Sequence, residues 1–348
     1  MTTPVIICDD SSLARKQMAR ALPENWDVEV TFAAHGQEAL DAIREGKGEI
    51  MFIDLNMPVM DGYETLEVIQ KEELPVVSIV VSGDIQPEAR ERVMQFGALD
   101  FIKKPTNKEA LEGLLQTYGL YSSGAPVPVE ESSGGAAPVA APAAAPEIPE
   151  DKKVTFYDAC QEVSNVAMGQ AANLLSQLLH CFIEMPIPKV RELEFNELQM
   201  ALQFAEQEQA ISALCQGFIG AGISGEALLI FNDASIQDIA KLMKYEGEID
   251  DSVELELLMD IANVLLGAAL KGLADQMDVK FSQGHPVVLG RHCSISELLQ
   301  DNKRWEKLLT IELDAAVQNH DIHCDLLLLF TEDSLPALRM RMWEVMDL

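Results

Sequence analysis

The segment Met51–Gly62 reads MFIDLNMPVMDG, an apolar run that ends at an aspartate and continues into a turn containing Pro58 and Gly62. A helical pattern follows from Tyr63 to Gln70. A short apolar run followed by a helical pattern is typical of a βα unit. Five such units follow one another between Val5 and Tyr118, which predicts an α/β domain with a parallel sheet covered by helices on both faces.

The other units extend on both sides of this segment. The predicted strands are Val5–Cys8, Val28–Ala33, Met51–Asp54, Val77–Val81 and Phe101–Ile102. The predicted helices are Ser11–Ala21, Gly36–Glu45, Tyr63–Gln70, Pro87–Phe96 and Thr106 to about Tyr118. Ligands of such sheets bind at the carboxyl ends of the strands.

Polar residues stand at these strand ends, namely Asp9, Asp10, Asp54, Ser82 and Lys104. Carboxylates that converge at one edge repel one another unless a cation is present, and oxygen-only ligands suit Mg²⁺. Mg²⁺ would also let a carboxylate attack a phosphoryl group, while the lysine and the serine hydroxyl hold phosphoryl oxygens. One aspartate at a strand end is usually a turn or cap residue, but five suitable residues together predict a phosphoryl-transfer site.

The motifs IICDDS, MFIDLNMPVMDG, VVSGD and DFIKKP closely resemble those of the response-regulator receiver family, which has a flavodoxin-like fold. The resemblance implies Asp54 as the phospho-acceptor and Asp9 and Asp10 as the acidic pocket for Mg²⁺, with Asn56 supplying a backbone carbonyl. It also implies a switch pair, Ser82 and Phe101, a phosphate-sensing lysine, Lys104, and a histidine kinase as phosphoryl donor.

A segment rich in Pro, Ala, Ser and Gly, SSGAPVPVEESSGGAAPVAAPAAAPEIPE, separates this domain from the rest of the chain. Its composition cannot form a core and predicts a flexible linker. The predicted organisation is therefore a receiver at residues 1–120, a linker at 121–151 and a second domain at 152–348.

The second domain is predicted to be an α/β or α+β unit with a mostly antiparallel sheet. Its long helices are Val154–His180 and Ser252–Met277, with extended segments from Val190 to Phe231 and from Val279 onward. Shorter helices are predicted at Asn232–Tyr245 and Glu332–Met346.

An internal repeat marks both long helices. Asp158-x3-Glu162-x2-Asn165-x22-Pro188 recurs 98 residues later as Glu256-x3-Asp260-x2-Asn263-x22-Pro286. At 100° per residue the first three residues of each copy fall within about 60° on one helical face. We expect this polar triplet to be exposed, with Val163, Ala167, Leu174 and Leu178 packed inward. A single polar set of this kind would be a solvated face, but two matched copies favour a site.

The repeat resembles the CheC/CheX/FliY phosphatase family, whose motif is Asp or Ser, three residues, Glu, two residues, Asn, twenty-two residues and Pro. The resemblance implies a pseudo-twofold domain that docks on a phosphorylated receiver. It implies that Glu162 pairs with a receiver lysine and that Asn165 orients a water for attack on the aspartyl phosphate. The second copy has Asp260 in place of Glu, so the site at Asp260 and Asn263 is expected to be weaker.

Two classes of function remain open. The leading hypothesis is an aspartyl-phosphate phosphatase acting on a separate phosphorylated CheY-like receiver and controlled through Asp54, with the chain's own Asp54 as the other substrate. The alternative is a non-catalytic receiver-binding or adaptor module in chemotaxis or flagellar signalling. The sequence leaves a homodimer open.

The net charge of −32, from 57 acidic and 25 basic residues, argues against nucleic acid as a partner. The first residues do not resemble a signal peptide, and apolar runs such as Leu326–Phe330 are too short to insert into a membrane, so we expect a soluble, cytoplasmic protein. The six scattered cysteines are expected to be reduced and mostly buried.

Two further motifs are expected to carry no chemistry. Gly220–Gly225 spells GxGxxG, but a strand pattern follows it, so a β-hairpin turn is expected instead of a dinucleotide site. His320 and His323 lie beside an apolar strand without an evident third ligand, so surface positions are expected.

Overall fold

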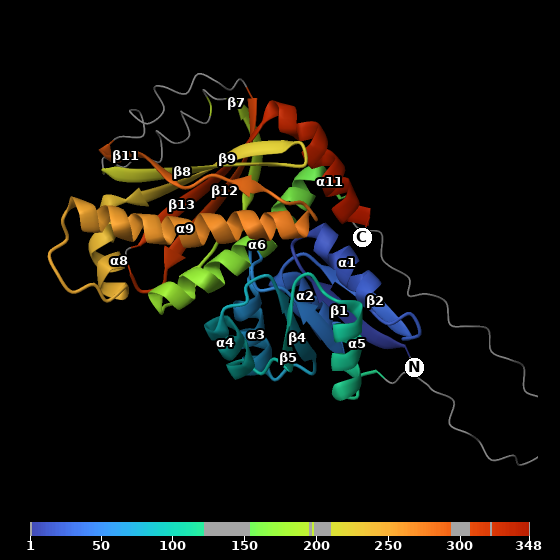
Figure 1. Ribbon diagram of the computed structural model, residues 1–348. Helices are drawn as coiled ribbons and strands as arrows, with labels where there is room; N and C mark the ends of the chain where they lie inside the picture. The colour runs from blue at the N-terminus through green and yellow to red at the C-terminus, as the bar shows by residue number, and fades with distance from the viewer. Residues whose placement is uncertain are drawn as a thin grey trace, which may run out of the picture. The chain divides into compact units, whose positions relative to one another are not determined.

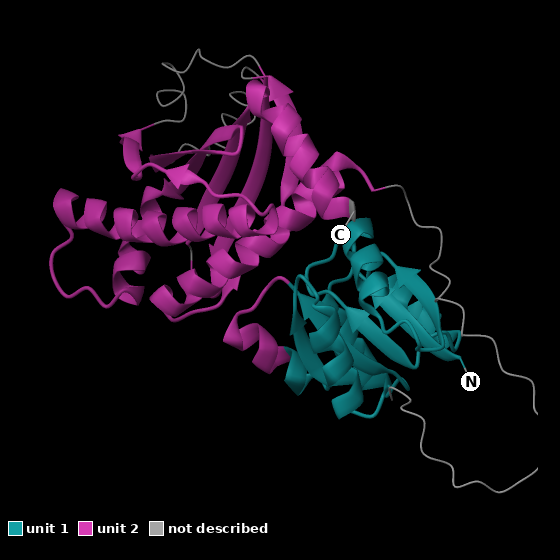
Figure 2. Ribbon diagram, turned by 45° about the vertical axis from the view of Figure 1, so that its right-hand side comes forward, with its two compact units in different colours: residues 1–82, 93–153 teal, residues 83–92, 154–348 magenta. Residues whose placement is uncertain are grey.

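The computed structural model in Figure 1 describes residues 2–121, 154–194, 197, 210–293, 307–320 and 322–347. The chain divides into two compact units, residues 1–82 with 93–153 and residues 83–92 with 154–348 (Figure 2). Residues 83–92, which the sequence assigns to the first domain, are thus grouped with the second unit. The predicted linker lies outside the described residues except for Tyr121, which is buried in the first domain.

The first domain, residues 2–121, contains the five predicted βα pairs. Its parallel sheet has the order β2-β1-β3-β4-β5. The strands are β1 (Thr3–Cys8), β2 (Val28–Ala33), β3 (Ile50–Ile53), β4 (Val77–Ser82) and β5 (Asp100–Lys103). The helices are α1 (Ser12–Ala21), α2 (Gly36–Arg44), α3 (Gly62–Glu72), α4 (Pro87–Gln95) and α5 (Lys108–Thr117). The predicted flavodoxin-like fold is confirmed.

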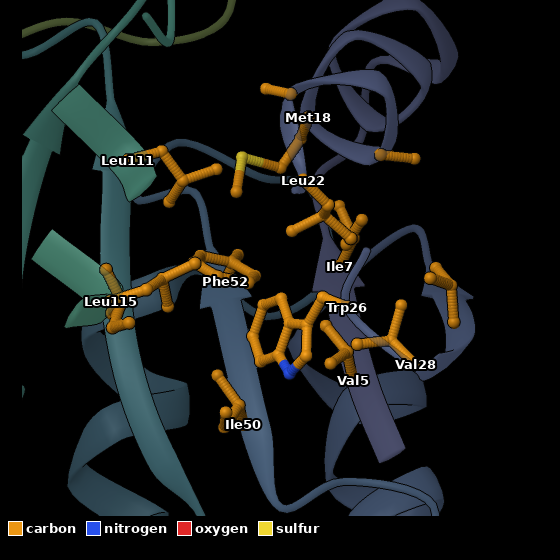
Figure 3. Packing of buried hydrophobic residues seen from close by; sticks show 14 of the residues in the cluster. Val5, Ile7, Met18, Leu22, Trp26, Val28, Ile50, Phe52, Leu111 and Leu115 are labelled. Carbon is orange, nitrogen blue, oxygen red and sulfur yellow. The ribbon is translucent and has the colours of Figure 1, made fainter. Parts of the chain in front are cut away.

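One face of this sheet packs against α1 and α5. Ile7 and Phe52 from the strands meet Leu22, the residue after α1, and Leu111 of α5, and Figure 3 shows their side chains pointing toward one another. Trp26 lies in the same cluster, and its ring centroid is 5.9 Å from that of Tyr121. The alternate strand residues are also buried, so the sheet is covered on both faces, as the continuous apolar strands predict.

Phe52 is 1% exposed at the centre of this cluster. Replacing it by alanine is expected to lower the free energy of unfolding of the first domain by roughly 3–5 kcal/mol, because the lost ring leaves a cavity. Urea denaturation checks this. The control is Met94→Ala on α4, where the side chain is 42% exposed and the expected change is within about 0.5 kcal/mol. Equal losses in the two variants would contradict this assignment of the core.

The second unit is built from two copies of one series of elements. The first copy contains α6 (Phe156–Leu179), β6 (Ile183–Glu184), β7 (Lys189–Glu194), β8 (Ile211–Gly220), β9 (Ile223–Asn232), the 3₁₀ turn η1 (Asp233–Ser235) and α8 (Ile236–Leu242). The second contains α9 (Asp251–Gln276), β10 (Ser282–Gln283), β11 (Val287–Cys293), β12 (Lys307–Val317), β13 (His323–Thr331), η2 (Glu332–Ser334) and α11 (Leu335–Asp347).

The two copies exchange their short strands. The sheet has the order β10-β8-β9-β13-β12-β6, with β11 also on β8 and β7 also on β12, and every pairing is antiparallel. Thus β6 and β7 of the first copy pair with the second copy, and β10 and β11 pair with the first. At the centre of the sheet, Ala227 of β9 pairs with Leu328 of β13, and Leu228 of β9 pairs with Leu327 of β13. Matching η1 to η2 makes Leu228 of the first copy correspond to Leu327 of the second, so exchanging the two copies converts the pair that they form into itself. The predicted antiparallel sheet and pseudo-twofold repeat are therefore present.

Helices α6 and α9 lie side by side along this sheet (Figure 1). They approach closely at two small residues, since a Cβ atom added to Gly272 would lie 2.9 Å from Cα of Ala167. Alternate residues of β13 point to opposite faces of the sheet. Leu327 and Leu329 lie in a hydrophobic cluster made of residues from the strands and not from the helices. Because both faces are covered, the apolar run Leu326–Phe330 forms a strand buried on both sides.

Helix α9 corrects one prediction. By length and composition it could cross a membrane, since its most apolar window has a mean hydropathy of 1.6, although no run of this length was expected. Sixty-seven per cent of that window is buried within the structure. Its apolar residues therefore serve as those of a core helix.

The predicted hairpin turn at Gly220–Gly225 and the predicted surface positions of His320 and His323 are confirmed. Gly220 ends β8 and Ile223 begins β9, with Ala221 (φ +52°) and Gly222 (φ +79°) forming the two-residue hairpin turn. His320 and His323 are exposed. None of the six cysteines forms a disulfide; Cys8, Cys160 and Cys324 are buried, whereas the other three are half-buried, so fewer are buried than expected. Burial raises the pKa of Cys324 to about 12, so this thiol stays protonated at neutral pH.

Candidate functional site

The turn after β3 fixes the position of Asp54. Asp54 donates its backbone N–H to the carbonyl of Cys8 on the neighbouring strand, 2.9 Å away. The backbone N–H of Gly62 donates to the carbonyl of Leu55, so the chain comes back close to Asp54 at Gly62. A Cβ atom added to Gly62 would lie 2.3 Å from the carbonyl oxygen of Asp54. Asp61 then begins α3 with a capping box. The glycine that closes MFIDLNMPVMDG is thus required by close backbone approach to Asp54.

Three carboxylates and one ammonium group meet at this edge. Oxygens of Asp9, Asp10 and Asp54 lie within 4.8 Å of one another. Lys104 Nζ lies 2.7 Å from Asp9 Oδ2 and 3.3 Å from Asp54 Oδ2, and its side chain is buried. The three carboxylates outnumber the cationic side chains of Lys104 and Arg15, and the remaining negative charge together with the all-oxygen donor set fits Mg²⁺.

Arg15 of α1 is a member of this site that the sequence did not single out. It is 5% exposed, and its guanidinium donates hydrogen bonds to the backbone carbonyls of Asp9 and Asp10. Arg15 therefore fixes the loop that carries the two carboxylates. Beside it, burial raises the pKa of the Cys8 thiol well above its ordinary value, and the charges of Asp9 and Asp54 raise it further. No local sequence signal distinguishes Arg15 from a surface helix residue.

The other residues predicted for this site lie on the neighbouring strands β4 and β5 and in the turn after β3. Ser82 ends β4, is fully buried and accepts a hydrogen bond at its carbonyl from the backbone N–H of Lys104, 2.9 Å away. Phe101 of β5 pairs with Val80 of β4 and is half-buried. Asn56, in the turn after Asp54, is also half-buried. Their switch and metal-binding roles stay predictions.

Helix α6 carries the first copy of the repeated triplet. Asp158 has a structural role, since it forms a capping box with Thr155. The Asp158 carboxylate accepts from the backbone N–H of Thr155 at 2.8 Å, and the backbone N–H of Asp158 donates to Thr155 Oγ1 at 3.2 Å. Glu162 and Asn165 follow one and two turns later. The first triplet position of α6 is therefore explained by helix capping, and the other two are not.

The predicted exposure of this triplet is wrong for Glu162, which is 6% exposed, whereas Asp158 and Asn165 are half-buried. Around Glu162, residues on most sides of α6 are buried, including Val163 and Val166. The position of a side chain on a helical wheel therefore does not determine its exposure here.

The predicted apolar stripe also fails at Leu174, which is 45% exposed. Val163 and Ala167 are buried as expected, but beyond the contact between Ala167 and Gly272 the buried positions shift to Ala172 and Leu175. The stripe therefore follows the crossing of the two helices and not a straight line.

Helix α9 carries the second copy. Glu256, Asp260 and Asn263 are all exposed, as predicted. Pro188 and Pro286 are buried, and each immediately precedes a strand, β7 or β11. The matched Asn-to-Pro spacing therefore reflects the repeated fold, whereas packing does not explain the repeated Asn.

The family profile described as response regulator receiver domain matches residues 5–116. Curated relatives include protein-glutamate methylesterase/protein-glutamine glutaminase 2 of Koribacter versatilis, 40% identical over 116 residues, which are 32% of this chain and 31% of that protein. The corresponding Geobacillus kaustophilus protein is 36% identical over 114 residues, 32% of each chain. The chain thus spans about a third of the length of these relatives. A receiver domain is present at residues 5–116.

Solved structures resemble each part of the chain. The response regulator domain of Thermotoga maritima CheB covers 35% of this chain and 100% of its own, with 27% identity and a TM-score of 0.31. Thermotoga maritima FliY covers 55% of this chain and 96% of its own, with 20% identity and a TM-score of 0.42.

Proposed function

We propose that this chain, whose first domain is a response regulator receiver domain, is a phosphorylation-controlled phosphatase of aspartyl phosphate in chemotaxis-type signalling. In this proposal the second domain hydrolyses the phospho-aspartate of a separate CheY-like receiver, and phosphorylation of Asp54 by a histidine kinase controls it. The reaction would take place in the cytoplasm.

The observation that carries the proposal is the repetition of an acidic residue and an asparagine on two equivalent helices. Core residues repeat in a duplicated fold because the packing repeats. Asp260 and Asn263 are exposed, so packing within the domain gives no reason for them to match Glu162 and Asn165. Polar residues that repeat although packing around the second copy does not require them are better explained by a repeated ligand.

A glycine on the same face supports a docking role. Gly267 follows Asn263 by four residues, so both lie on one side of α9, and Gly169 follows Asn165 by the same interval. No described atom lies within 4 Å of a Cβ added to Gly267, so its small size is not required by packing within the described structure. Since glycine destabilises a helix by about 0.5–1 kcal/mol relative to alanine, a close approach by a partner would account for it.

The chemistry requires little from the phosphatase. An acyl phosphate is already reactive, and the Mg²⁺ of the phosphorylated receiver neutralises the developing charge. The Asn165 carboxamide would hold a water for in-line attack, with its Oδ1 accepting from the water. Glu162 would pair with the receiver's phosphate-site lysine. Positioning of this kind is worth about 10²-fold in rate.

The receiver site would supply the control. Asp9, Asp10 and Asp54 would hold Mg²⁺, which supplies charge neutralisation when bound, and the Asp54 carboxylate would attack the phosphoryl donor. Lys104 would then hold a phosphoryl oxygen, and Ser82 and Phe101 would respond to it. The ion pairs of Lys104 with Asp9 and Asp54 describe the state before phosphorylation.

The test is the decay of a CheY receiver labelled through acetyl [³²P]phosphate, in Mg²⁺, with and without the full chain. Faster decay, in proportion to the amount of chain added, supports a separate substrate. Loss of label from the chain's own Asp54 at a rate independent of its concentration supports the self-limiting alternative. An unchanged decay rate together with binding would favour the non-catalytic adaptor.

Asn263→Ala is expected to slow hydrolysis less than Asn165→Ala does. Asp260 is one methylene shorter than Glu162 and reaches less far toward a partner lysine. Initial rates of both single variants and of the double variant measure the contribution of each site. The double variant should lose all acceleration. A larger loss from Asn263→Ala alone would reverse this ranking.

Gly267→Ala is expected to stabilise the second domain by about 0.5–1 kcal/mol while weakening docking at α9. Thermal denaturation and hydrolysis in the Asn165→Ala background measure the two effects. Gly113→Ala is the matched control: it also lies within a helix, α5, with no described atom within 4 Å of an added Cβ. It should stabilise its helix and leave hydrolysis unchanged; an equal loss of activity in both variants would exclude a docking role for Gly267.

A further inference from the structure

Three ligating side chains from distant segments meet in the second domain, away from the phosphatase motif. They are Asp233 of η1, Glu254 in the first turn of α9 and His292 of β11. One donor atom from each lies within 4.8 Å of the others. His292 Nδ1 is 2.8 Å from Asp233 Oδ2, and its Nε2 is 3.3 Å from Glu254 Oε1.

Glu254 points to a missing ligand. The residue is 8% exposed, and its buried Oε1 has no hydrogen-bond partner among the described residues, although His292 Nε2 lies near it. A buried carboxylate oxygen without a hydrogen bond is costly. The neighbouring guanidinium of Arg291 does not supply one, since it donates to the backbone carbonyl of Asp251.

The fold itself does not require this trio. The equivalent positions of the other copy are Phe156 on α6, Glu194 on β7 and Glu332, the first residue of η2, as the matched elements place them. There an aromatic ring replaces the buried carboxylate, and the Arg339 guanidinium lies 4.3 Å from the ring centroid. The same junction is thus formed without an imidazole, so the trio is a feature of one copy only.

We propose that Asp233, Glu254 and His292 form a binding site for a divalent transition-metal ion of the Zn²⁺ class. Glu254 Oε1 and His292 Nε2 would bind the ion directly, with water in the open positions, while Asp233 at Nδ1 would orient the imidazole. Mg²⁺ would be disfavoured because it prefers oxygen ligands alone.

Such an ion would join segments of both copies at the beginning of α9. Glu254 lies about 200° from Glu256 and about 180° from Asn263 around the helix, at 100° per residue. The ion would therefore bind on the side of α9 opposite the exposed triplet. Its role would be to fix the first turns of α9, the helix that carries the second motif, to η1 and β11. It would take no part in the phosphoryl chemistry of the receiver.

Calorimetric titration with Zn²⁺ tests the site in the full chain after removal of bound metal, with excess Mg²⁺ present to occupy the receiver pocket. One Zn²⁺ per chain is expected, with a rise in the melting temperature of the second domain. Binding should be lost in His292→Asn and in Glu254→Gln. His323→Asn, at an exposed histidine at the start of β13, should keep it.

Co²⁺ provides a second readout, since binding in a four- or five-coordinate site intensifies its visible d–d absorption, and the same variants should remove this increase. Zn²⁺ binding of equal stoichiometry in the wild type and in both variants would overturn the proposal, as would no binding to the wild type. Circular dichroism of the metal-free variants checks folding. If one variant fails to fold, Asp233→Asn takes its place, with weaker Zn²⁺ binding expected because the imidazole loses its orienting partner.

Discussion

Replacing Asn165 by alanine is expected to slow the hydrolysis of a phosphorylated CheY receiver by about 10²-fold, because the carboxamide that positions the water is lost. Binding of the receiver should change little, since Asn165 orients a water and does not anchor the partner. The decay of ³²P-labelled receiver measures the rate, and fluorescence anisotropy of a labelled receiver carrying beryllofluoride measures the affinity.

Asn173→Ala is the matched control for Asn165→Ala. Asn173 lies on the same helix and is also half-buried, but it is outside the repeated triplet. It should leave the hydrolysis rate unchanged. If Asn165→Ala hydrolyses as fast as the wild type, the phosphatase proposal fails, and a non-catalytic role of the same helix becomes the better explanation.

Asp54→Asn is expected to abolish phosphorylation of the chain by acetyl phosphate. The amide has nearly the size of the carboxylate, so it should fit a position that is 1% exposed, but it lacks the nucleophilic oxygen. Electrophoresis on phosphate-binding gels after incubation in Mg²⁺ measures the phosphorylated fraction. Omission of Mg²⁺ should also prevent phosphorylation of the wild type.

Asp41→Asn provides the comparison for Asp54→Asn. Asp41 is exposed on α2 and contacts Arg44 at 3.4 Å, so its loss should affect neither phosphorylation nor folding. Phosphorylation that persists in Asp54→Asn would place the acceptor on another side chain. The hydrolysis rate of Asp54→Asn toward a separate receiver then shows whether the regulatory domain acts as an activator or as an inhibitor.

The receiver could be predicted from its sequence because its determinants are local. Each apolar run is one strand, and the rule that parallel strands end at one edge is sufficient to bring Asp9, Asp54 and Lys104 together. The repeat on α6 and α9 was also visible, since Asn and Pro recur at equal spacing. The spacing could not show that Asp158 caps a helix or that the prolines precede strands.

The features that were not predicted depend on packing between distant segments. The exposure of Leu174 and the burial of Glu162 follow from surroundings that a helical wheel does not contain. The cluster of Asp233, Glu254 and His292 joins three segments with no common motif. The composition of the best window of α9 would allow it to cross a membrane, although the predicted apolar runs are too short to do so.

The exchange of β6 and β7 for β10 and β11 has a consequence for how the second domain unfolds. Each half has its short strands on the long strands of the other, so neither half retains a complete set of backbone hydrogen bonds alone. The two halves should therefore melt in a single cooperative transition despite their duplicated sequence. Such an arrangement is also what a symmetric pair of identical half-length chains would leave after fusion into one polypeptide.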